Sequence, residues 1–199
     1  SRQSPSTQAC LPDLSSRLPK EIISTGIIDS YIEPFVGGGA FFFYLKSKFD
    51  IENSYLFDIN RELVIGYKVI QNDYKKLIGI LKELQSNYVL NNEKERHNYF
   101  YTIRAKYNNQ INNFEYNHYN EEWVMRAAYL IFLNKTCFNG LYRQNNKGEF
   151  NVPWGKYKNP KICDKENLKQ VNLALKNTEI ICGDFSESSK YITKNSLVY

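Results

Sequence analysis

A glycine-rich turn between two apolar segments constrains the fold of this chain more than any other feature. Residues 30–43 read Ser-Tyr-Ile-Glu-Pro-Phe-Val-Gly-Gly-Gly-Ala-Phe-Phe-Phe. A short apolar run breaks at Gly37, Gly38 and Gly39, and an aromatic, helix-compatible segment follows. Glycine lacks a Cβ atom, so the chain can turn tightly and a ligand can approach the backbone N–H groups. The pattern predicts a strand, a ligand-binding loop and a helix, although an ordinary loop of an α/β domain can carry the same glycines.

An acidic residue about 20 positions further on strengthens this interpretation. Asp58 ends a second apolar run, residues 55–57. A carboxylate at the end of a second strand can accept hydrogen bonds from both hydroxyls of a ribose, which nucleoside-containing cofactors offer. The alternative is structural, because Asp58 or Asn60 could simply cap the helix expected over residues 61–71.

Short apolar segments predict the strands of one parallel sheet. They are residues 28–33, 54–57, 179–182 and 196–199. Helices are expected after the first two strands, and this alternation is typical of a parallel α/β sheet.

The long interval between the second and third strands has no strand pattern strong enough to continue the sheet. A helix is expected over residues 121–133, where apolar side chains recur at 3.6-residue spacing and mark a buried face. They are Val124, Ala127, Ala128, Ile131 and Phe132. We therefore predict a partial catalytic domain formed by residues 1–73 and 177–199, with residues 74–176 inserted as a second domain.

Residues 138–157 combine the side chains that nucleic-acid binding requires. They supply cations for phosphates, flat rings for stacking and amides for base edges. The cations are Arg143, Lys147 and Lys156, with Lys158 directly after the segment; the rings are Phe138 and Tyr142, and the amides are Asn139 and Gln144. Arg143 is the strongest candidate for base reading, because its planar fork can donate two hydrogen bonds to guanine O6 and N7. A basic surface hairpin without a partner is the alternative.

Composition is compatible with this interpretation without requiring it. The 199 residues are 42% hydrophobic, enough for a full core, and the formal net charge of +5 suits a polyanionic partner. No C-x-x-C pair and no metal-ligand cluster is visible, so we expect no metal and interpret the cysteines as reduced thiols. The cysteines are Cys10, Cys137, Cys163 and Cys182, and the two histidines are His97 and His118. Without a signal-peptide core or an apolar run of about 18 residues, we expect a cytoplasmic protein with no membrane contact.

Motifs in a fixed order closely resemble the Dam-type (D12 class) DNA adenine-N6 methyltransferases. The first is Glu33-Pro34-Phe35-x-Gly37-Gly38-Gly39, followed by Asp58-Ile59-Asn60. Residues 134–143 with residues 148–157 look like the DNA-recognition hairpin of the family almost position for position. Gly183-Asp184-Phe185 matches the segment that holds the adenine of the cofactor. The similarity covers residues 18–199.

This resemblance implies a Rossmann-like methyltransferase fold with a mostly helical target-recognition insert that carries a β-hairpin. It also implies S-adenosyl-L-methionine as cofactor, S-adenosyl-L-homocysteine as product, and double-stranded DNA as substrate, with adenine-N6 methylation on GATC. The residues expected to bind the cofactor are Glu33, Pro34, Phe35, Gly37, Gly39, Asp58, Asp184 and Phe185. Those expected to contact DNA are Asn134, Lys135, Phe138, Asn139, Gly140, Leu141, Tyr142, Arg143, Lys147 and Pro153.

The chain departs from the family pattern at both ends. The Asp-Pro-Pro-Tyr motif that holds the target amine in the family does not occur, and we expect it directly after Tyr199. We therefore assign no catalytic residue and expect residues 1–199 alone to be inactive, as a fragment or a natural truncation. Near the start, Ser1-Arg2-Gln3-Ser4-Pro5-Ser6 stands where the family has Lys-Trp-x-Gly-Gly-Lys.

Two other functions stay open at this point. One is a catalytically inactive, sequence-specific DNA-binding module that keeps the hairpin. The other is a small-molecule enzyme, which would leave the hairpin unexplained. Restriction-modification, repair marking and epigenetic control all use this chemistry, so a restriction endonuclease is expected only as a functional partner, and no direct protein partner is inferred.

Overall fold

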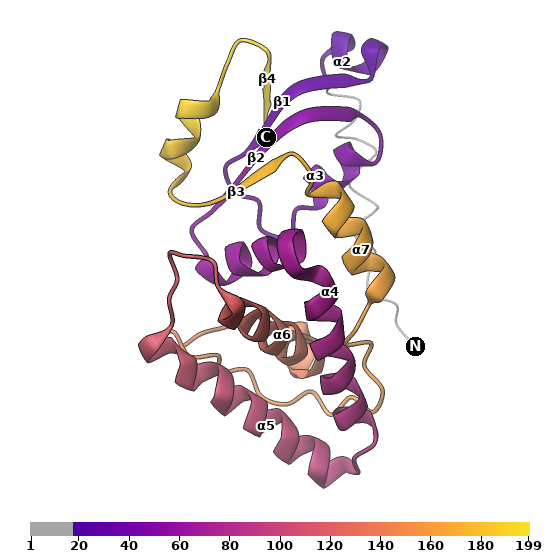
Figure 1. Ribbon diagram of the computed structural model, residues 1–199, viewed down its shortest axis with the longest axis vertical. Helices are drawn as coiled ribbons and strands as arrows, with labels where there is room; N and C mark the ends of the chain where they lie inside the picture. The colour runs from indigo at the N-terminus through magenta and orange to yellow at the C-terminus, as the bar shows by residue number, and fades with distance from the viewer. Residues whose placement is uncertain (1–17) are drawn as a thin grey trace. The chain divides into compact units, whose positions relative to one another are not determined.

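The computed structural model describes residues 18–199 and divides into two compact units (Figure 1). The first unit comprises the chain up to Val64 together with the segment from Leu173 to Tyr199, and the second runs from Ile65 to Asn172. The predicted departure at residues 1–6 and the predicted thiol of Cys10 lie outside the described residues. The predicted domain boundaries remain a prediction, because compactness does not define which unit binds a cofactor or DNA.

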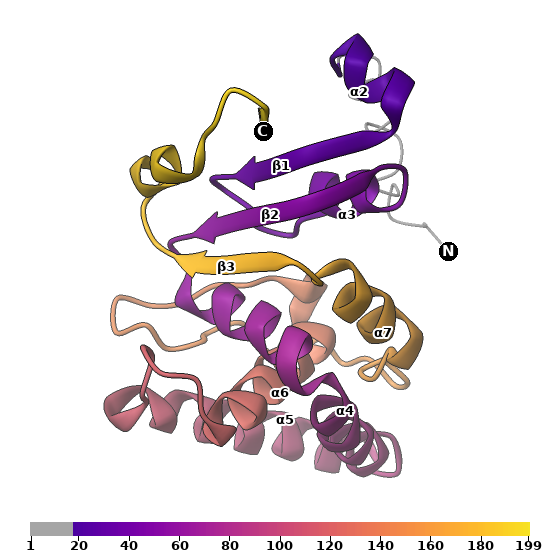
Figure 2. The ribbon, with the colours of Figure 1, turned by 45° about the horizontal axis from the view of Figure 1, so that its top comes forward.

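A parallel four-stranded sheet is the centre of the first unit. Its strands are β1 (Ile27–Glu33), β2 (Asp50–Asp58), β3 (Thr178–Cys182) and β4 (Ser196–Val198), in the order β3-β2-β1-β4. Figure 2 shows β1, β2 and β3 running in the same direction, as the pairing registers require. The four strands and their parallel arrangement confirm the sequence prediction. β2 begins at Asp50, earlier than predicted, because buried Ile51 pairs in register with Ile28 of β1.

The two faces of this sheet carry different helices. Tyr31 of β1 contacts Phe41 and Phe42 of α3 (Ala40–Lys46) on one face. On the other face, Tyr55 of β2 packs on Tyr191 of the 3₁₀ helix η4 (Phe185–Tyr191), with ring centroids 4.5 Å apart. A short helix α2 (Lys20–Thr25) precedes β1.

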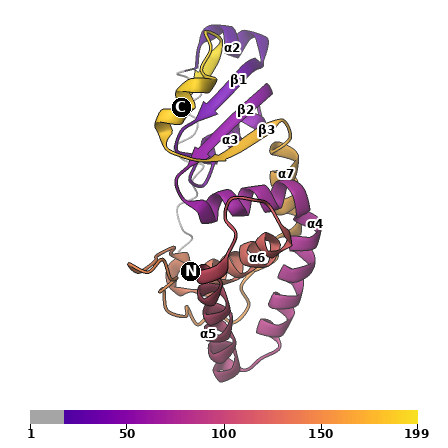
Figure 3. The same ribbon diagram turned by 60° about the vertical axis from the view of Figure 1, so that its left-hand side comes forward.

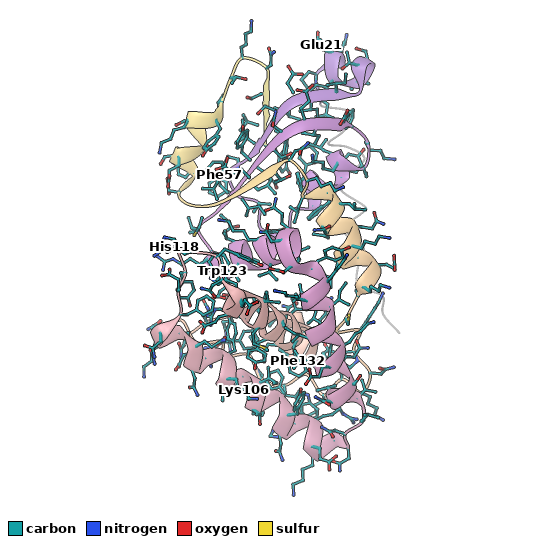
Figure 4. All side chains as sticks on the ribbon, in the orientation of Figure 1. Glu21, Phe57, Lys106, His118, Trp123 and Phe132 are labelled. Atoms are coloured by element: carbon teal, nitrogen blue, oxygen red, sulfur yellow. The ribbon has the colours of Figure 1, made fainter. Side chains whose placement is uncertain are left out.

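Helices form most of the second unit (Figure 3), and residues 141–164 are a non-helical segment within it. They are α4 (Arg61–Val89), α5 (Glu93–Asn109), η2 (Gln110–Asn113), α6 (Glu121–Thr136), η3 (Phe138–Gly140) and α7 (Lys165–Ala174), of which α4 begins and α7 ends in the first unit. The predicted helix over residues 121–133 is confirmed as α6, which continues to Thr136. Trp123 and Phe132 of this helix, labelled in Figure 4, are buried in one aromatic-rich core. Ile131, also predicted on the buried face, is half-buried and packs against that core.

A kink in α4 lies beside the end of the second unit. Asp73 departs from helical geometry, with φ −132° and ψ 29°. A break in the helical hydrogen-bond ladder leaves carbonyl groups that need other donors. The Asn172 side-chain amide donates to the carbonyls of Ile70 and Gln71, at 2.9 Å each. Asn172, the last residue of this unit, is thereby linked to α4, its first helix.

Candidate functional sites

Asp58 is the structural centre of the first candidate site, at the carboxyl end of β2. Its Oδ2 accepts a hydrogen bond from the Gly37 N–H at 3.0 Å, and its Oδ1 accepts one from the Asn60 N–H at 2.8 Å. A carboxylate has about four lone-pair positions, so each oxygen can still accept a further hydrogen bond. The backbone therefore fixes the orientation of Asp58 and leaves its acceptor capacity half used.

Asn60 caps the helix that follows. Its Oδ1 accepts a hydrogen bond from the Glu62 N–H at 3.1 Å, the usual contact of a capping side chain at the start of a helix. Of the two capping candidates, Asn60 makes this contact. Asp58 is bonded to the Gly37 loop and to the turn before the helix instead.

The predicted glycine turn has the backbone geometry that glycine permits. Gly37 and Gly39 have φ angles of 47° and 65°, in the left-handed region. The Val36 N–H donates to the Phe57 carbonyl at 2.9 Å, which holds the loop on the end of β2. From Gly39 the chain continues directly into α3. The strand, loop and helix predicted for residues 30–43 are confirmed.

A second loop reaches the same strand end from β3. The Gly183 N–H donates to the Asp58 carbonyl at 3.2 Å. Asp184 then caps η4, because its Oδ1 accepts a hydrogen bond from the Ser186 N–H. Hydrogen bonds from the backbone and side chain of Ser186 hold the pKa of the Asp184 carboxyl below its usual range. Phe185 is 53% exposed, and its ring lies 5.5 Å from that of Phe35, which is 69% exposed. Two exposed aromatic rings therefore meet beside Asp58, and Pro34 is half-buried next to Phe35.

Glu33 lies beneath this surface rather than on it. It is 4% exposed at the end of β1, and its Oε2 accepts a hydrogen bond from the Tyr31 hydroxyl at 2.8 Å. Burial raises the pKa of Glu33 to about 7, against the opposing effect of hydrogen bonds from Tyr31 and the Phe42 backbone. Burial and the neighbouring Glu33 carboxyl also raise the pKa of Tyr31. Glu33 thus connects the end of β1 to the Phe42 backbone in α3, and its contact with the cofactor stays a prediction.

The second candidate site is the hairpin of the second unit. The pairing is antiparallel at two isolated bridges, Gln144 with Phe150 and Cys137 with Trp154, so the predicted β-hairpin forms without continuous strands. Left-handed Asn139 and Gly140 interrupt one arm, and Pro153 lacks an N–H group on the other. Few backbone hydrogen bonds therefore join the two arms of the hairpin.

The first arm of this hairpin begins with exposed apolar side chains. Phe138, Leu141 and Tyr142 are all at least partly exposed. The Asn134 side chain donates to the Gly140 carbonyl at 2.8 Å, and the Phe138 N–H donates to the Pro153 carbonyl at 2.8 Å. These contacts bring together predicted DNA-contacting residues from α6 and from both arms. Lys135, Arg143 and Lys147 are exposed on the same segment of chain.

Asn151 and Asn145 are hairpin residues that the sequence reasoning did not single out. The Arg143 Nε donates to Asn151 Oδ1 at 2.7 Å, and Arg143 Nη2 donates to the Asn151 carbonyl at 3.3 Å. Asn145 Oδ1 accepts from the N–H groups of Lys147 and Glu149, at 3.0 Å each. The segment Asn-Asn-Lys-Gly at 145–148 is a turn signature that would have fixed the hairpin register and placed Asn151 opposite Arg143.

Among residues 18–199, no group of three or more His, Cys, Asp or Glu side chains could hold a metal ion. Cys137, Cys163 and Cys182 are free thiols. In this part of the chain, no helix combines the length and the apolar character needed to cross a lipid bilayer.

The fold and the first site define a class of protein. A parallel sheet with the order β3-β2-β1-β4, a glycine loop after β1 and an acid at the end of β2 is consistent with the S-adenosylmethionine-dependent methyltransferase fold. The chain belongs to the D12 class N6 adenine-specific DNA methyltransferase family, whose model matches residues 8–199. This confirms the resemblance found in the sequence, and members of the family depend on S-adenosylmethionine.

Individual relatives agree with this assignment. The Type II methyltransferase M.MjaIII of Methanocaldococcus jannaschii is 46% identical over 189 residues, covering 95% of this chain and 63% of that protein. The DNA N-6-adenine-methyltransferase of Escherichia phage P1 is 36% identical over 155 residues, covering 78% of this chain and 18% of that protein. The DNA adenine methylase of Salmonella typhi is 29% identical over 189 residues, covering 95% and 58%. The chain thus spans less than two thirds of the length of each of these relatives.

Proposed function

We propose that the whole protein is a site-specific DNA methyltransferase that transfers the methyl group of S-adenosylmethionine to N6 of adenine in double-stranded DNA, with GATC as its target. The observation that carries this proposal is the Asp58 carboxylate, held by the Gly37 N–H in a chain of the D12 class family. The target sequence rests on the resemblance to the Dam-type enzymes.

The first site fits the cofactor chemically. Asp58 retains two acceptor positions for the ribose hydroxyls, and the glycine loop leaves its backbone open to a ligand. Phe35 and Phe185 offer flat apolar surfaces to the purine, and the capped Asp184 stands beside them. Glu33 would hold the loop in place from below. When bound, the cofactor supplies an electrophilic methyl group on a sulfonium.

The second site would recognise the duplex. Arg143 would read guanine from the major groove, Leu141 and Pro153 would contact bases, and Lys135 and Lys147 would contact phosphates. Exposed Phe138 with Asn139 would help to open the stack, since chemistry on N6 requires the adenine to be flipped out of the duplex. We propose on this basis that residues 74–176 are the target-recognition domain and that residues 1–73 and 177–199 belong to the cofactor-binding domain.

In the reaction, the adenine N6 forms a bond to the methyl carbon while the bond from that carbon to sulfur breaks, and N6 loses a proton. Residues 1–199 contain no Asp-Pro-Pro-Tyr to hold the amine, so the proposal assigns catalysis to the whole protein. Residues 1–199 alone would bind cofactor and DNA without transferring the methyl group. The Type II names among the relatives support a restriction-modification setting, in which a cognate endonuclease would be a functional partner.

A labelled-methyl transfer assay tests the proposal. The whole protein should methylate a duplex with a single GATC and give background counts on a duplex that carries N6-methyladenine at both target positions. Residues 1–199 alone should give background counts on both duplexes. Specific binding of the whole protein to GATC without any transfer would replace the proposal by an inactive DNA-binding module. Transfer to a different sequence would refute the GATC target alone.

A further inference from the structure

The Arg143 guanidinium is already held by a partner across the hairpin. Gln144 pairs with Phe150, which places Arg143 opposite Asn151, and the Asn151 N–H donates to the Arg143 carbonyl at 3.1 Å. The side chain follows the same register, since Arg143 Nε and Nη2 donate to the Asn151 Oδ1 and carbonyl oxygens. Both side chain and backbone of Asn151 therefore engage one arginine.

These two bonds use one particular edge of the guanidinium group. Nε and Nη2 lie on its side edge, so Nη1 and the second hydrogen of Nη2 remain on the end edge. Two parallel N–H groups on one edge are what guanine O6 and N7 accept. The Asn151 contact thus occupies the edge that is not needed for base reading and fixes the plane of the edge that is.

Asn151 is itself attached to a rigid part of the second unit. Its neighbour Phe150 is buried. The Asn108 side chain of α5 makes two hydrogen bonds to the Phe150 backbone, accepting from its N–H at 2.9 Å and donating to its carbonyl at 3.1 Å. An open, polar hollow of about 650 Å³ lies beside this arm, lined by Arg143, Gln144, Asn145, Asn146, Lys147 and Asn151. The arm that carries Asn151 is therefore anchored to the helical core, whereas Arg143 reaches out from the exposed arm.

We propose that Asn151 is a positioning residue for base recognition, which orients Arg143 so that its end edge meets the guanine of the target site. The inference rests on the proposed DNA-methyltransferase function and deepens it. The flexible arginine side chain loses rotamer freedom when it binds a base. A guanidinium group that is already held in place before binding loses less of that freedom. Asn151 acts through Arg143 in this role, and its removal should lower discrimination rather than general DNA affinity.

The test pairs substitutions in the protein with the replacement of one acceptor atom in the DNA. The whole protein, saturated with S-adenosylhomocysteine, is titrated by fluorescence anisotropy with a GATC duplex and with the same duplex containing 7-deazaguanine, in which a C–H group replaces the N7 acceptor. Wild type should bind the 7-deaza duplex about tenfold more weakly, the loss expected for part of a bidentate contact. Arg143→Ala should lose this sensitivity altogether. Lys147→Ala, in the turn of the same hairpin, should keep this sensitivity while binding both duplexes more weakly.

Asn151→Ala should bind unrelated duplex as wild type does, and its sensitivity to 7-deazaguanine should fall to about threefold or less. Asn151→Asp keeps an oxygen acceptor for Arg143 Nε, so it should restore the tenfold ratio even if added negative charge weakens all DNA binding. Full sensitivity in Asn151→Ala, with equal losses on both duplexes, would make Asn151 a phosphate contact and overturn the inference. A wild type that ignores 7-deazaguanine would also overturn it, while methyl transfer on GATC would still support the proposed function.

Discussion

The Phe35 and Phe185 rings lie 5.5 Å apart at an interplanar angle of 32°, although one follows β1 and the other follows β3. They meet because both loops are tied to the end of β2, one through the Asp58 carboxylate and the other through its carbonyl. Both rings are more than half exposed in this contact, an unfavourable arrangement for large apolar groups in water. A purine placed against them would cover that surface.

Phe185→Ala should therefore weaken S-adenosylhomocysteine binding by about tenfold, on the order of 1–2 kcal/mol for a lost aromatic contact. Phe138→Ala is a matched control, since Phe138 is 52% exposed but lies in the hairpin. It should leave cofactor affinity unchanged and weaken binding to GATC duplex. Isothermal titration calorimetry of both variants measures the first effect, and DNA anisotropy the second. Equal losses of cofactor affinity in the two variants would remove Phe185 from the cofactor site.

Asp58 and Asn60 permit a similar separation of roles. Asp58→Ala removes the acceptor for Gly37 and the proposed acceptor for the ribose, so it should weaken S-adenosylhomocysteine binding by at least tenfold, since each unpaired donor costs about 1–3 kcal/mol. Asn60→Ala removes the cap contact to Glu62 and should lower the free energy of unfolding by about 1 kcal/mol with unchanged affinity. Calorimetric titration and thermal melting of both variants distinguish these effects. Unchanged affinity in Asp58→Ala would leave that residue a purely structural role.

Glu33 should make stability depend on pH. Its pKa is about 7 in the folded protein and 4.5 in the reference state, so the native state retains a proton that the unfolded chain releases. Stability is then highest below about pH 4.5 and falls as the pH rises to 7, by on the order of 2–3 kcal/mol. Glu33→Gln keeps an acceptor for Tyr31 without a charge and should remove this fall. Urea denaturation between pH 4.5 and 8 compares the two proteins, and parallel curves would contradict the prediction.

Gly155 and Gly79 should respond to alanine in opposite directions. A Cβ on Gly155 would lie 2.5 Å from the Cys137 carbonyl oxygen, a backbone atom at the base of the hairpin. Gly155→Ala should therefore destabilise the protein by about 1–3 kcal/mol. Gly79 is exposed within α4 with no atom near its Cβ position, and Gly79→Ala should stabilise by about 0.5–1 kcal/mol. An unchanged or raised melting temperature of Gly155→Ala would show that the hairpin base adapts to the added methyl group, and a lowered one for Gly79→Ala would contradict the prediction for α4.

The sequence was sufficient for the features that depend on local pattern. Apolar runs and the glycines at 37–39 predicted the strands, the loop after β1 and the parallel sheet, because each signal lies within a few neighbouring residues. α5 was not predicted, since its buried residues Phe100, Ile103 and Tyr107 stand among many other tyrosines and polar side chains.

Contacts between distant residues were beyond such reasoning. Asp58 and Asn60 were equal candidates for the helix cap until the bond from Gly37 distinguished them. Glu33 was expected at the cofactor, and strand alternation puts it on the same face as Tyr31, but only the folded structure shows that this face is buried and that the two side chains are hydrogen-bonded. The turn signature at 145–148 could have placed Asn151 opposite Arg143, but the hydrogen bond between the two side chains also depends on their rotamers. Each of these facts needs the geometry of the folded chain.

The two hydrogen bonds of Asn172 have a consequence for the order of folding. Parallel pairing of β2 with β3 must close a long loop, because Asp58 and Thr178 flank the whole second unit, and long-range closure slows folding. Once Asn172 is bonded to Ile70 and Gln71, only residues 59–69 separate β2 from this contact, and only residues 173–177 separate it from β3. We expect amides of α5 and α6 to gain protection from hydrogen exchange before those of β3 during refolding, and the reverse order would contradict this. Phe185 would then reach the glycine loop and Asp58 only after the inserted unit has folded.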